Sequence, residues 1–507
     1  MKNWLVLNLL VLAGASVVSA RPNFVIMYVD DLGWADTSVR MMNSDPESAS
    51  DFHRTPHLEA LARRGMTFSC AYAPAPTCTP SRKSIQFGKT PGRLGYTFVH
   101  DVLALQKKLE WKDETSLADV LKAADAQYIT AHFGKGMGNE RMETIGYDVT
   151  DEVDGNASNG NFHGDYISLK NRTKLPPDNP KRMASLKKST VDFVHEHGGK
   201  RPFFMMVSHY AVHVPHQARA DLIEKYRKLP RGKYCTDKDY LPVDAMPKGY
   251  TIHSWRLQYA AMLEEVDEGL GAIVDALKKT GQLENTLILL TSDNGGGLGP
   301  NGTLRGGKAN LYEGGLRVPF VVAGPGVKPG VQCDVPIVQW DLLPTFHDYA
   351  GSERPLPEDL DGGSLRGVFE RGNEGTVTRP VEGFIFHYPC YFAPPLSVIR
   401  LGDYKFMEHH LSGERKLFNV VTDLGEKNNL IRTMPEKAAA MDAVMSGYLK
   451  SINAEDVQEV YKARFAELDR FEKGARSIHA KAVERAGEDR KLIAEADQKL
   501  AKDLARF

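Results

Sequence analysis

The 507-residue chain has almost no excess charge of either sign, because 64 lysines and arginines stand against 65 aspartates and glutamates, and the net charge is -1. This balance excludes a general attraction to nucleic acid or to an anionic membrane, so any anion binding must be local. The sequence also lacks an internal repeat and any long low-complexity tract, which argues against repeat architectures. What remains is a globular composition, 42% apolar and 25% charged, that allows one large unit or two unequal domains.

Long apolar runs are also scarce, and the one that matters lies at the N-terminus. Lys2 precedes an apolar run from 5 to 18, and Val18-Ser19-Ala20 is a small-residue cleavage site. We therefore expect residues 1–20 to be a secretory signal peptide and the mature protein to be periplasmic or secreted. An uncleaved membrane anchor is the alternative, but the run is short for a membrane span and no stop-transfer pattern follows. We expect no stable membrane span after cleavage.

Cysteine is rare as well. The five cysteines are Cys70, Cys78, Cys235, Cys333 and Cys390. An odd number in an exported protein implies one cysteine with a separate fate, and Cys78 is the candidate for reasons given below. The other four could form disulfides or remain buried thiols, and the sequence leaves their pairing open.

Segments typical of strands alternate with segments typical of helices. Apolar, β-branched runs predict buried strands at 23–29, 66–72, 128–133, 202–208 and 286–291. Amphipathic spacing predicts helices at 57–64, 117–124, 183–197 and 255–279. This alternation predicts an α/β fold with a large, mostly parallel mixed sheet, covered by helices on both faces, and with function at the carboxyl ends of the strands.

The pattern changes near residue 381. Short strand-like pieces at 383–387, 397–400, 404–408 and 416–419 predict a smaller antiparallel sheet, and 434–507 is helical and highly charged. We expect a signal peptide at 1–20, a catalytic domain at 21–380, an α+β subdomain at 381–455 and a charged helical extension at 456–507. A solvated helix or hairpin is favoured over a partner-binding coil for that extension.

The strongest local signal is Cys78-Thr79-Pro80-Ser81-Arg82, with Gly88 ten residues after the cysteine. Locally it is a Pro-containing loop that starts a helix, and a helix N-terminus favours anions. The stretch resembles the signature of the formylglycine-dependent sulfatases, which are arylsulfatase A-like enzymes of the alkaline phosphatase superfamily. In that family the cysteine is oxidised to an aldehyde and becomes the nucleophile. The resemblance covers about residues 21–430.

Two polar pairs follow predicted strands, Asp30-Asp31 and Asp293-Asn294. Taken alone, such pairs are usually loop or cap chemistry, although oxygen ligands suit calcium or magnesium better than zinc. The segments RPNFVIMYVDDLGWAD and TSDNGG resemble the two metal-ligand segments of the sulfatases. The resemblance implies one divalent cation, calcium first and magnesium as the alternative, held by Asp30, Asp31, Asp293, Asn294 and an oxygen of the modified Cys78.

Four basic residues match other family motifs: Arg82, Lys135 in AHFGKGMG, His213 in SHYAVHVPH and Lys308 in LRGGKANLYEGGLRVPF. The resemblance implies a catalytic set of Cys78, Arg82, Lys135, His213 and Lys308, in which Lys135, His213 and Lys308 also bind substrate and His213 protonates the leaving oxygen. The spacing of His209, His213 and His216 also allows zinc, but Pro215 and the lack of an HExxH motif argue against it.

The family mechanism implies that the aldehyde hydrates to a geminal diol, that one hydroxyl attacks sulfur, and that the other then expels sulfate. This chain departs from the family at Gly134-Lys135-Gly136-Met137, where the usual pattern is Gly-Lys-Trp-His. The histidine credited with deprotonating the diol is therefore absent, and His132 is a nearby histidine that need not face the site. Phe87 and Lys89 also replace a usual Thr and Arg.

We therefore expect an exported sulfatase that hydrolyses sulfate esters of a carbohydrate or aryl alcohol. The alternatives are a phosphonate or phosphate monoester hydrolase with the same nucleophile, and a non-catalytic protein that binds sulfated glycans. Expected partners are the sulfated substrate and a formylglycine-generating or anaerobic sulfatase-maturating enzyme, with no nucleic acid. The segments 139–180, 228–250 and 387–391 are expected to form substrate subsites, with aromatic side chains that stack on sugar rings.

Overall fold

The computed structural model describes residues 21–99, 111–138, 140–151, 178–214, 216–240, 256–297, 301–389 and 395–460, with scattered residues beyond 460. The expected signal peptide, most of the 139–180 excursion and most of the helical extension lie outside these residues. Within the described ranges, no helix is long and apolar enough to cross a membrane.

An eight-stranded mixed sheet forms the centre of the molecule, in the order β5-β4-β6-β1-β7-β8-β2-β9. Its strands are β1 (Asn23–Val29), β2 (Met66–Phe68), β4 (Ile129–Gly134), β5 (Val149–Thr150), β6 (Phe203–Ser208), β7 (Thr286–Ser292), β8 (Phe320–Ala323) and β9 (Val331–Cys333). The strands from β5 to β7 are parallel, and β8 runs antiparallel to both of its neighbours. Val29 pairs with Ser292, so the chain leaves β1 and β7 at the same edge.

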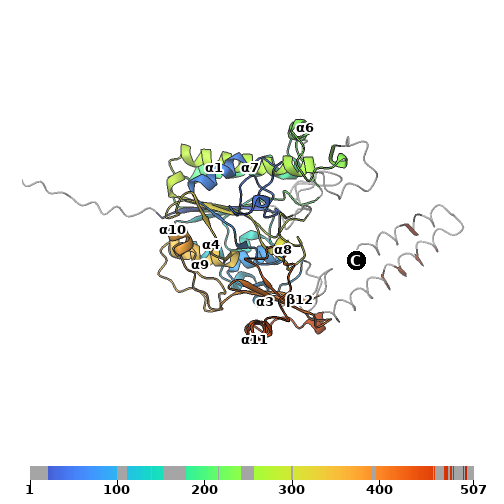
Figure 1. Cartoon of the computed structure of the whole chain (residues 1–507). Helices are drawn as coiled ribbons and strands as arrows, with labels where there is room; N and C mark the ends of the chain where they lie inside the picture. Colours follow the sequence, from blue (N-terminus) through green and yellow to red (C-terminus); the bar gives the residue numbers. More distant parts are fainter. Residues whose placement is uncertain are drawn as a thin grey trace, which may run out of the picture.

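Helices cover both faces of this sheet, as the sequence predicts (Figure 1). The helices on one face are α1 (Pro56–Arg64), α5 (Met183–His197) and α7 (Arg256–Lys279), with α6 (Ala220–Lys228) packed on α7. Those on the other face are α2 (Cys78–Phe87), α4 (Leu117–Ala124), α9 (Leu342–Tyr349) and α10 (Arg366–Arg371). Phe24 and Ile26 of β1 enter one core and Val25 and Met27 the other, which explains the unbroken apolar run of this strand.

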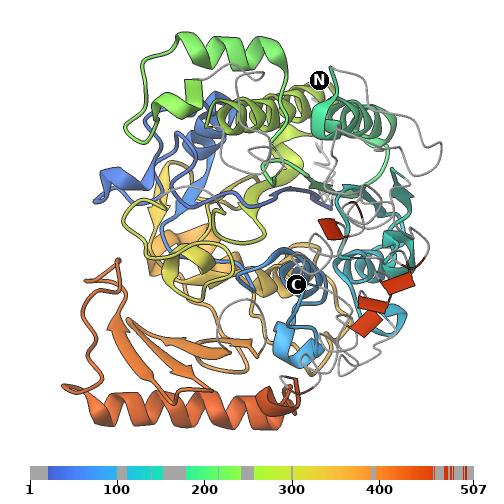
Figure 2. The same cartoon turned by 90° about the vertical axis from the view of Figure 1, so that its right-hand side faces the viewer.

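A second, four-stranded antiparallel sheet lies at one end of the molecule (Figure 2). It consists of β11 (Phe384–Tyr388), β12 (Leu396–Leu401), β13 (Tyr404–His409) and β14 (Arg415–Asn419), and α11 (Pro435–Ser451) packs on it. The opposite face of the sheet packs against Tyr72 and Trp340 of the main unit. The predicted short strands and antiparallel sheet are therefore confirmed.

One strand prediction is wrong in detail. The run 66–72 divides into β2 and β3 (Ala71–Tyr72), and β3 pairs with β10 (Ile337–Val338) in a separate two-stranded sheet. The chain changes partner at the break: Ser69 N–H donates to Cys333 O, whereas Cys70 O accepts from Ile337 N–H. The remaining short helices are α3 (Pro91–Leu94) and α8 (Glu313–Leu316).

Candidate functional site

The two acidic segments meet where β1 and β7 end. Asp30, Asp31 and Asp293 are buried, and one carboxylate oxygen of each lies within 4.8 Å of the others. Asp31 adopts a left-handed backbone conformation, with φ of 61°, and its N–H donates to Asp293 Oδ1 at 3.1 Å. Leu32 N–H donates to Ser292 Oγ at 2.9 Å. The parallel pairing and this turn bring together residues that are 262 positions apart.

The oxygen atoms of this cluster fit a divalent cation. Asp30 Oδ1 and Asn294 Oδ1 are buried and have no hydrogen-bond partner among the described residues. Asn294 Nδ2 donates to Asp31 Oδ1 at 2.8 Å, which orients the amide. Burial, and then the neighbouring Asp30, raise the pKa of Asp293 to about 7. Burying oxygens without hydrogen bonds destabilises the folded protein, and so does the repulsion between neighbouring carboxylates. A hard divalent cation bound by these oxygens would offset both effects. The donor set therefore suits calcium or magnesium.

Two of the predicted cations, Arg82 and Lys135, contact the same carboxylates. Arg82 Nε donates to Asp293 Oδ2 at 2.9 Å, and the NH2 group forms an ion pair with the same oxygen at 2.8 Å. Lys135 Nζ lies 2.5 Å from Asp30 Oδ2. Burial alone would raise the pKa of Asp30, but Lys135, His213 and Arg82 together hold it well below its usual range. The predicted cations therefore line the predicted anionic centre.

Cys78 is the first residue of α2 and is 8% exposed. Arg82 lies one helical turn further on, so both side chains share one face of the helix. The preceding loop is fixed by Ser81 Oγ, which accepts from Ala75 N–H and donates to Ala75 O, both at 3.0 Å. A cysteine here lies where a helix N-terminus favours an anion.

Lys308 joins the cysteine loop to the carboxylates. Its Nζ lies 2.8 Å from Asp31 Oδ2, and the next residue, Ala309, donates its N–H to Pro76 O at 2.7 Å. Burial lowers the pKa of Lys308, but Asp31 and then Cys78 outweigh burial and raise it. Asp31 and Cys78 therefore both favour the charged form of this ammonium group.

Lys135 follows a turn that requires glycine. Gly134 has φ of 96°, and a Cβ there would lie 2.0 Å from Ser208 O. Lys135 N–H donates to that same oxygen at 2.7 Å, and Arg82 NH1 donates to Lys135 O at 3.2 Å and to Ser208 Oγ at 2.5 Å. The ends of β4 and β6 and helix α2 thus hold Lys135 in place.

His213 lies beside Asp31. Its segment pairs with the end of β1, since Asp30 N–H donates to Ala211 O at 2.9 Å and Val212 N–H donates to Asp30 O at 2.8 Å. His213 Nε2 is 3.7 Å from Asp31 Oδ2, and Nδ1 donates to Val214 O at 2.6 Å. Burial lowers the pKa of His213 to about 4, against the opposing effect of Asp31 and Asp30.

Comparisons with known proteins agree with this geometry. A family model described as Sulfatase matches residues 22–352. The chain belongs to the sulfatase family. The enzyme is a sulfuric ester hydrolase. It is 27% identical to a sulfatase of Formosa agariphila, over 82% of this chain and 86% of that protein, and 28% identical to arylsulfatase A of Homo sapiens, over 78% and 76%. In fold it is similar to a protein crystallised with its substrate D-glucosamine-2-N,6-O-disulfate, with a TM-score of 0.64, 21% identity and coverage of 85% of this chain and 98% of that chain.

This sulfatase departs from the family motif at Gly134-Lys135-Gly136-Met137, where it has no histidine. Met137 is 1% exposed and packs in a hydrophobic core. His132 is also buried, with its ring edge-on to Tyr147 at 5.4 Å, and burial followed by Arg82 lowers its pKa to about 3. An imidazole that is packed in the core and has so low a pKa is a weak base, so His132 is a poor replacement for the missing histidine.

The other two histidines of the predicted trio are not members of the acidic group. His209 is buried at the end of β6, and neither of its ring nitrogens has a hydrogen-bond partner among the described residues. His216 packs edge-on against Tyr259 at 5.5 Å. The acidic trio is the one candidate metal group found in the described part of the chain, and it contains no histidine. This arrangement gives no support to zinc.

Two residues near the site escaped the sequence analysis. Ser208 Oγ accepts a hydrogen bond from Arg82 NH1. Its position at the end of a predicted strand is a sequence signal that could have identified Ser208. Lys181 is fully buried, with φ of 53°. Burial lowers its pKa to about 7, while Asp30 and Asp31 oppose the shift, so it lies within electrostatic reach of the carboxylates. Nothing in the motif pattern around Lys181 indicates this.

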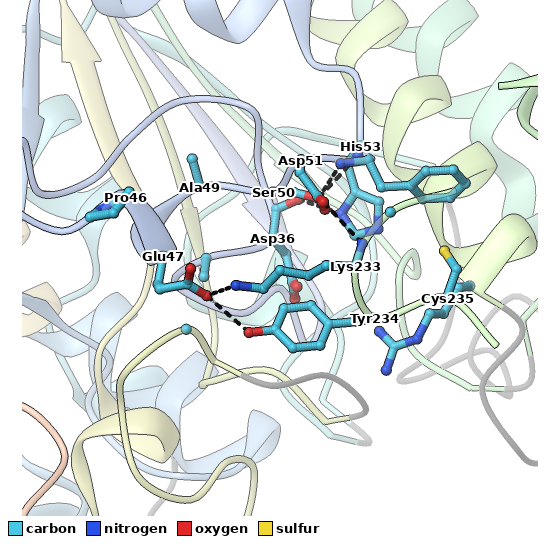
Figure 3. Close-up of a pocket in the computed structure, with 15 residues that line it drawn as sticks. Asp36, Pro46, Glu47, Ala49, Ser50, Asp51, His53, Lys233, Tyr234 and Cys235 are labelled. Carbon is cyan, nitrogen blue, oxygen red and sulfur yellow. Dashed lines mark hydrogen bonds and ion pairs between the residues drawn. The ribbon is translucent and has the colours of Figure 1, made fainter. Parts of the chain in front are cut away.

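A separate pocket of about 110 Å³ lies between residues 46–53 and 232–235 of the sulfatase (Figure 3). Lys233 and Tyr234 point toward Glu47, which pairs with the lysine and accepts from Tyr234 Oη at 3.0 Å. No predicted catalytic residue lines this pocket. It includes part of the 228–250 segment, so a subsite there stays a prediction.

In the segment 387–391, where aromatic side chains were expected to stack on sugar rings, His387 and Tyr388 are not free to do so, and residues 390 and 391 lie outside the described residues. Both side chains are buried on β11, with 9% and 2% of their surface exposed. His387 Nδ1 bonds Ser397 Oγ at 2.8 Å and Nε2 bonds Glu455 O at 2.9 Å. These contacts connect β11 to β12 and to the segment that follows α11. Both side chains are buried because successive side chains of β11 point to opposite faces of the sheet and both faces are packed.

Proposed function

We propose that this sulfatase is exported and hydrolyses sulfate esters of a carbohydrate, using a formylglycine made from Cys78 and one divalent cation. The observation that carries the proposal is a pair of buried oxygens, Asp30 Oδ1 and Asn294 Oδ1, that accept no hydrogen bond from any described residue and lie in a carboxylate cluster bonded to the helix that begins at the cysteine. Asp30, Asp31, Asp293 and Asn294 would hold the cation. Calcium is the preferred ion, because flexible oxygen-only sites suit it. The apolar run near the N-terminus supports export to the periplasm or the medium.

The formylglycine and the cation would supply part of the chemistry, and side chains of the protein would supply the rest. The hydrated aldehyde supplies an oxygen nucleophile and the cation stabilises negative charge when both are present. Arg82 and Lys135 hold Asp293 and Asp30 in fixed positions through the contacts described above. Lys308, paired with Asp31, would bind the oxygens of the substrate sulfate and neutralise charge that develops on them.

His213 is the proposed proton donor. Val214 O accepts the proton on Nδ1, so the proton for the leaving oxygen must come from Nε2 of the imidazolium. Burial disfavours that charged form, but Asp31 favours it, and a bound sulfate group would favour it further. The ring would therefore take up a proton as substrate binds and return it to the departing alcohol.

A sulfated carbohydrate is the proposed substrate class. The support is the fold shared with the protein crystallised with D-glucosamine-2-N,6-O-disulfate. Maturation of Cys78 would require a formylglycine-generating or anaerobic sulfatase-maturating enzyme, since the thiol must be oxidised and its sulfur exchanged for oxygen.

Parallel assays test the proposal. Protein from the native host is given a sulfated monosaccharide, an aryl sulfate, an aryl phosphate and an aryl phosphonate, with Cys78→Ala as the matched control. We expect release of inorganic sulfate, with the highest kcat/KM on the sugar, and loss of turnover in Cys78→Ala. Preferential hydrolysis of the phosphonate or phosphate would overturn the substrate class, and full activity of Cys78→Ala would overturn the nucleophile.

A further inference from the structure

A group of buried polar side chains lies at the ends of β1 and β7, next to the acidic cluster. The preceding residues on this face of the two strands are apolar and pack in the core beside α2; they are Phe24, Ile26, Leu287 and Leu289. Tyr28 and Thr291 come next on the same face, because side chains alternate along a strand, and the two residues are paired in register. Both are fully buried, so their hydroxyl groups need hydrogen-bond partners within the protein.

Gln339 provides these partners from outside the sheet. It is the first residue of the short 3-10 helix Gln339–Asp341 and is 1% exposed. Its Oε1 accepts from Tyr28 Oη at 2.8 Å, and its Nε2 donates to Thr291 Oγ1 at 3.0 Å and to Ser292 O at 2.6 Å. Because Ser292 O can only accept, the amide nitrogen must face β7 and the amide oxygen must face Tyr28. The side chain of Gln339 therefore has one orientation.

The first effect of Gln339 on the acidic cluster passes through the backbone. The Ser292 carbonyl that it bonds belongs to the peptide that leads directly into Asp293. Ser292 is also held through its side chain, because its Oγ donates to Asn294 O at 2.9 Å and accepts from Leu32 N–H at 2.9 Å. Gln339 therefore helps to fix the last peptide of β7 before two of the expected cation ligands.

The second effect passes through Tyr28 and Arg82. The Arg82 guanidinium carbon lies 5.1 Å from the centre of the Tyr28 ring. Arg82 Nε in turn donates to Asp293 Oδ2 at 2.9 Å. The hydrogen bond from Tyr28 Oη to Gln339 holds the ring against which the guanidinium lies. Gln339 thus supports Asp293 both through its backbone and through the partner of its side chain.

We propose that Gln339 is a positioning residue of the cation site, and that it raises the affinity for the divalent cation by holding Asp293 in place. This inference rests on the proposed function, since the cation is part of that proposal. Residues that orient metal ligands through hydrogen bonds change metal affinity by roughly 10- to 100-fold when they are replaced. An apolar side chain at position 339 would leave Thr291 Oγ1 and Ser292 O without this donor, and the end of β7 would be free to shift.

Calorimetric titration of calcium, and in parallel of magnesium, into the metal-free full-length enzyme tests the proposal. One variant is Gln339→Met, which has a similar length but no amide. The control is Tyr448→Phe, which loses a buried hydrogen bond to Thr90 Oγ1 outside the cluster and so reports the effect of lost stability alone. We expect Gln339→Met to weaken calcium binding at least about tenfold, and Tyr448→Phe to bind calcium as the wild type does.

An unchanged calcium affinity in Gln339→Met would overturn the inference while leaving the cation site intact. A wild type that binds neither calcium nor magnesium would overturn the proposed cation site itself. If Gln339→Met does not fold, Tyr28→Phe decides, because it removes the hydrogen bond to Gln339 but keeps the ring against Arg82. Its calcium affinity should fall by roughly several-fold, and an affinity equal to that of the wild type would contradict the proposal.

Discussion

At the scale of single residues, the site works by opposing charges in a buried space. Each carboxylate of the cluster has a short contact with a cation: Asp30 with Lys135, Asp31 with Lys308 and Asp293 with Arg82. These contacts leave Asp30 Oδ1 and Asn294 Oδ1 without a hydrogen bond among the described residues, although Arg82 NH2 lies 3.8 Å from Asp30 Oδ1. The cations thus hold the carboxylates in place while oxygens remain for a metal ion.

Lys308 is the residue we expect to contribute most to sulfate recognition. Lys308→Met should lower kcat/KM on a sulfated substrate by about 100-fold, because it removes a half-buried positive charge that pairs with Asp31 of the acidic cluster. Steady-state kinetics on an aryl sulfate measure this effect. Lys328→Met, which changes an exposed lysine, is the control and should behave as wild type. An unchanged kcat/KM in Lys308→Met would remove Lys308 from the mechanism.

The carboxylate cluster should also make stability depend on a cation. Treatment with a chelator should lower the melting temperature of the wild type, because the three buried carboxylates lose their shared counter-ion. Calcium should restore it at lower concentration than magnesium, as thermal unfolding would show. The shift should be smaller in Asn294→Ala, which lacks one of the unpartnered oxygens. A melting temperature that does not respond to chelation would count against the cation site.

At the scale of elements, α7 carries a buried acid outside the site. Glu265 is 4% exposed, and its Oε2 has no hydrogen-bond partner among the described residues. Burial is the main reason that its pKa is raised to about 8, with a smaller contribution from Glu268. The protonated form is therefore the stable one in the folded protein.

This shift predicts how stability changes with pH. A raised folded-state pKa stabilises the protein below the ordinary value of 4.5, and that stabilisation is lost as pH rises toward about 8. Glu265→Gln removes the titrating carboxyl. Between pH 4.5 and about 8, the free energy of unfolding of the variant should therefore rise relative to that of wild type by on the order of a few kcal/mol. Urea unfolding at several pH values measures it, with the exposed Glu284→Gln as control. Parallel pH profiles for wild type and Glu265→Gln would show that the carboxyl is not buried in solution.

Helices and strands with a regular spacing of apolar residues could be predicted from the sequence. Elements whose bounds depend on contacts with distant residues could not. The strand 23–29 and the helices 117–124 and 183–197 have the predicted bounds, since their apolar spacing alone determines them. The run 66–72 changes sheets because Cys333 and Ile337 supply different partners, which local sequence does not encode. The polar pairs that follow two strands could be recognised as motifs. Lys181 could not, because only the folded chain, with a left-handed backbone at this residue, brings it within electrostatic reach of Asp30 and Asp31.

At the scale of the whole molecule, a buried ionic network joins the C-terminal sheet to the main unit. Lys405 of β13 bonds Glu313 of α8, and Glu426 accepts from Glu313 N–H at 2.7 Å. Arg317 NH2 donates to Val420 O at 3.0 Å. The two units therefore share polar as well as apolar contacts, and we expect them to unfold together.

Lys405→Met should test this coupling. The substitution leaves Glu313 and Glu426 with an uncompensated buried charge, which should cost roughly 3 kcal/mol of stability. Guanidinium unfolding followed by fluorescence should show one transition at lower denaturant. Lys450→Met, in which an exposed lysine of α11 is replaced, should leave the midpoint unchanged. Two separate transitions, or no loss of stability, would mean that the network does not join the units.

The central claim is that Cys78 becomes the nucleophile of this sulfatase, because α2 begins at that residue beside Lys308 and the carboxylate cluster. A mass spectrum of the tryptic peptide 65–82, from protein isolated from its native host, tests it most directly. We predict a peptide lighter than the cysteine form by the exchange of one sulfur and two hydrogens for one oxygen, and reactive toward a hydrazide. A peptide that contains only unmodified cysteine, in preparations that hydrolyse sulfate esters, would contradict the claim.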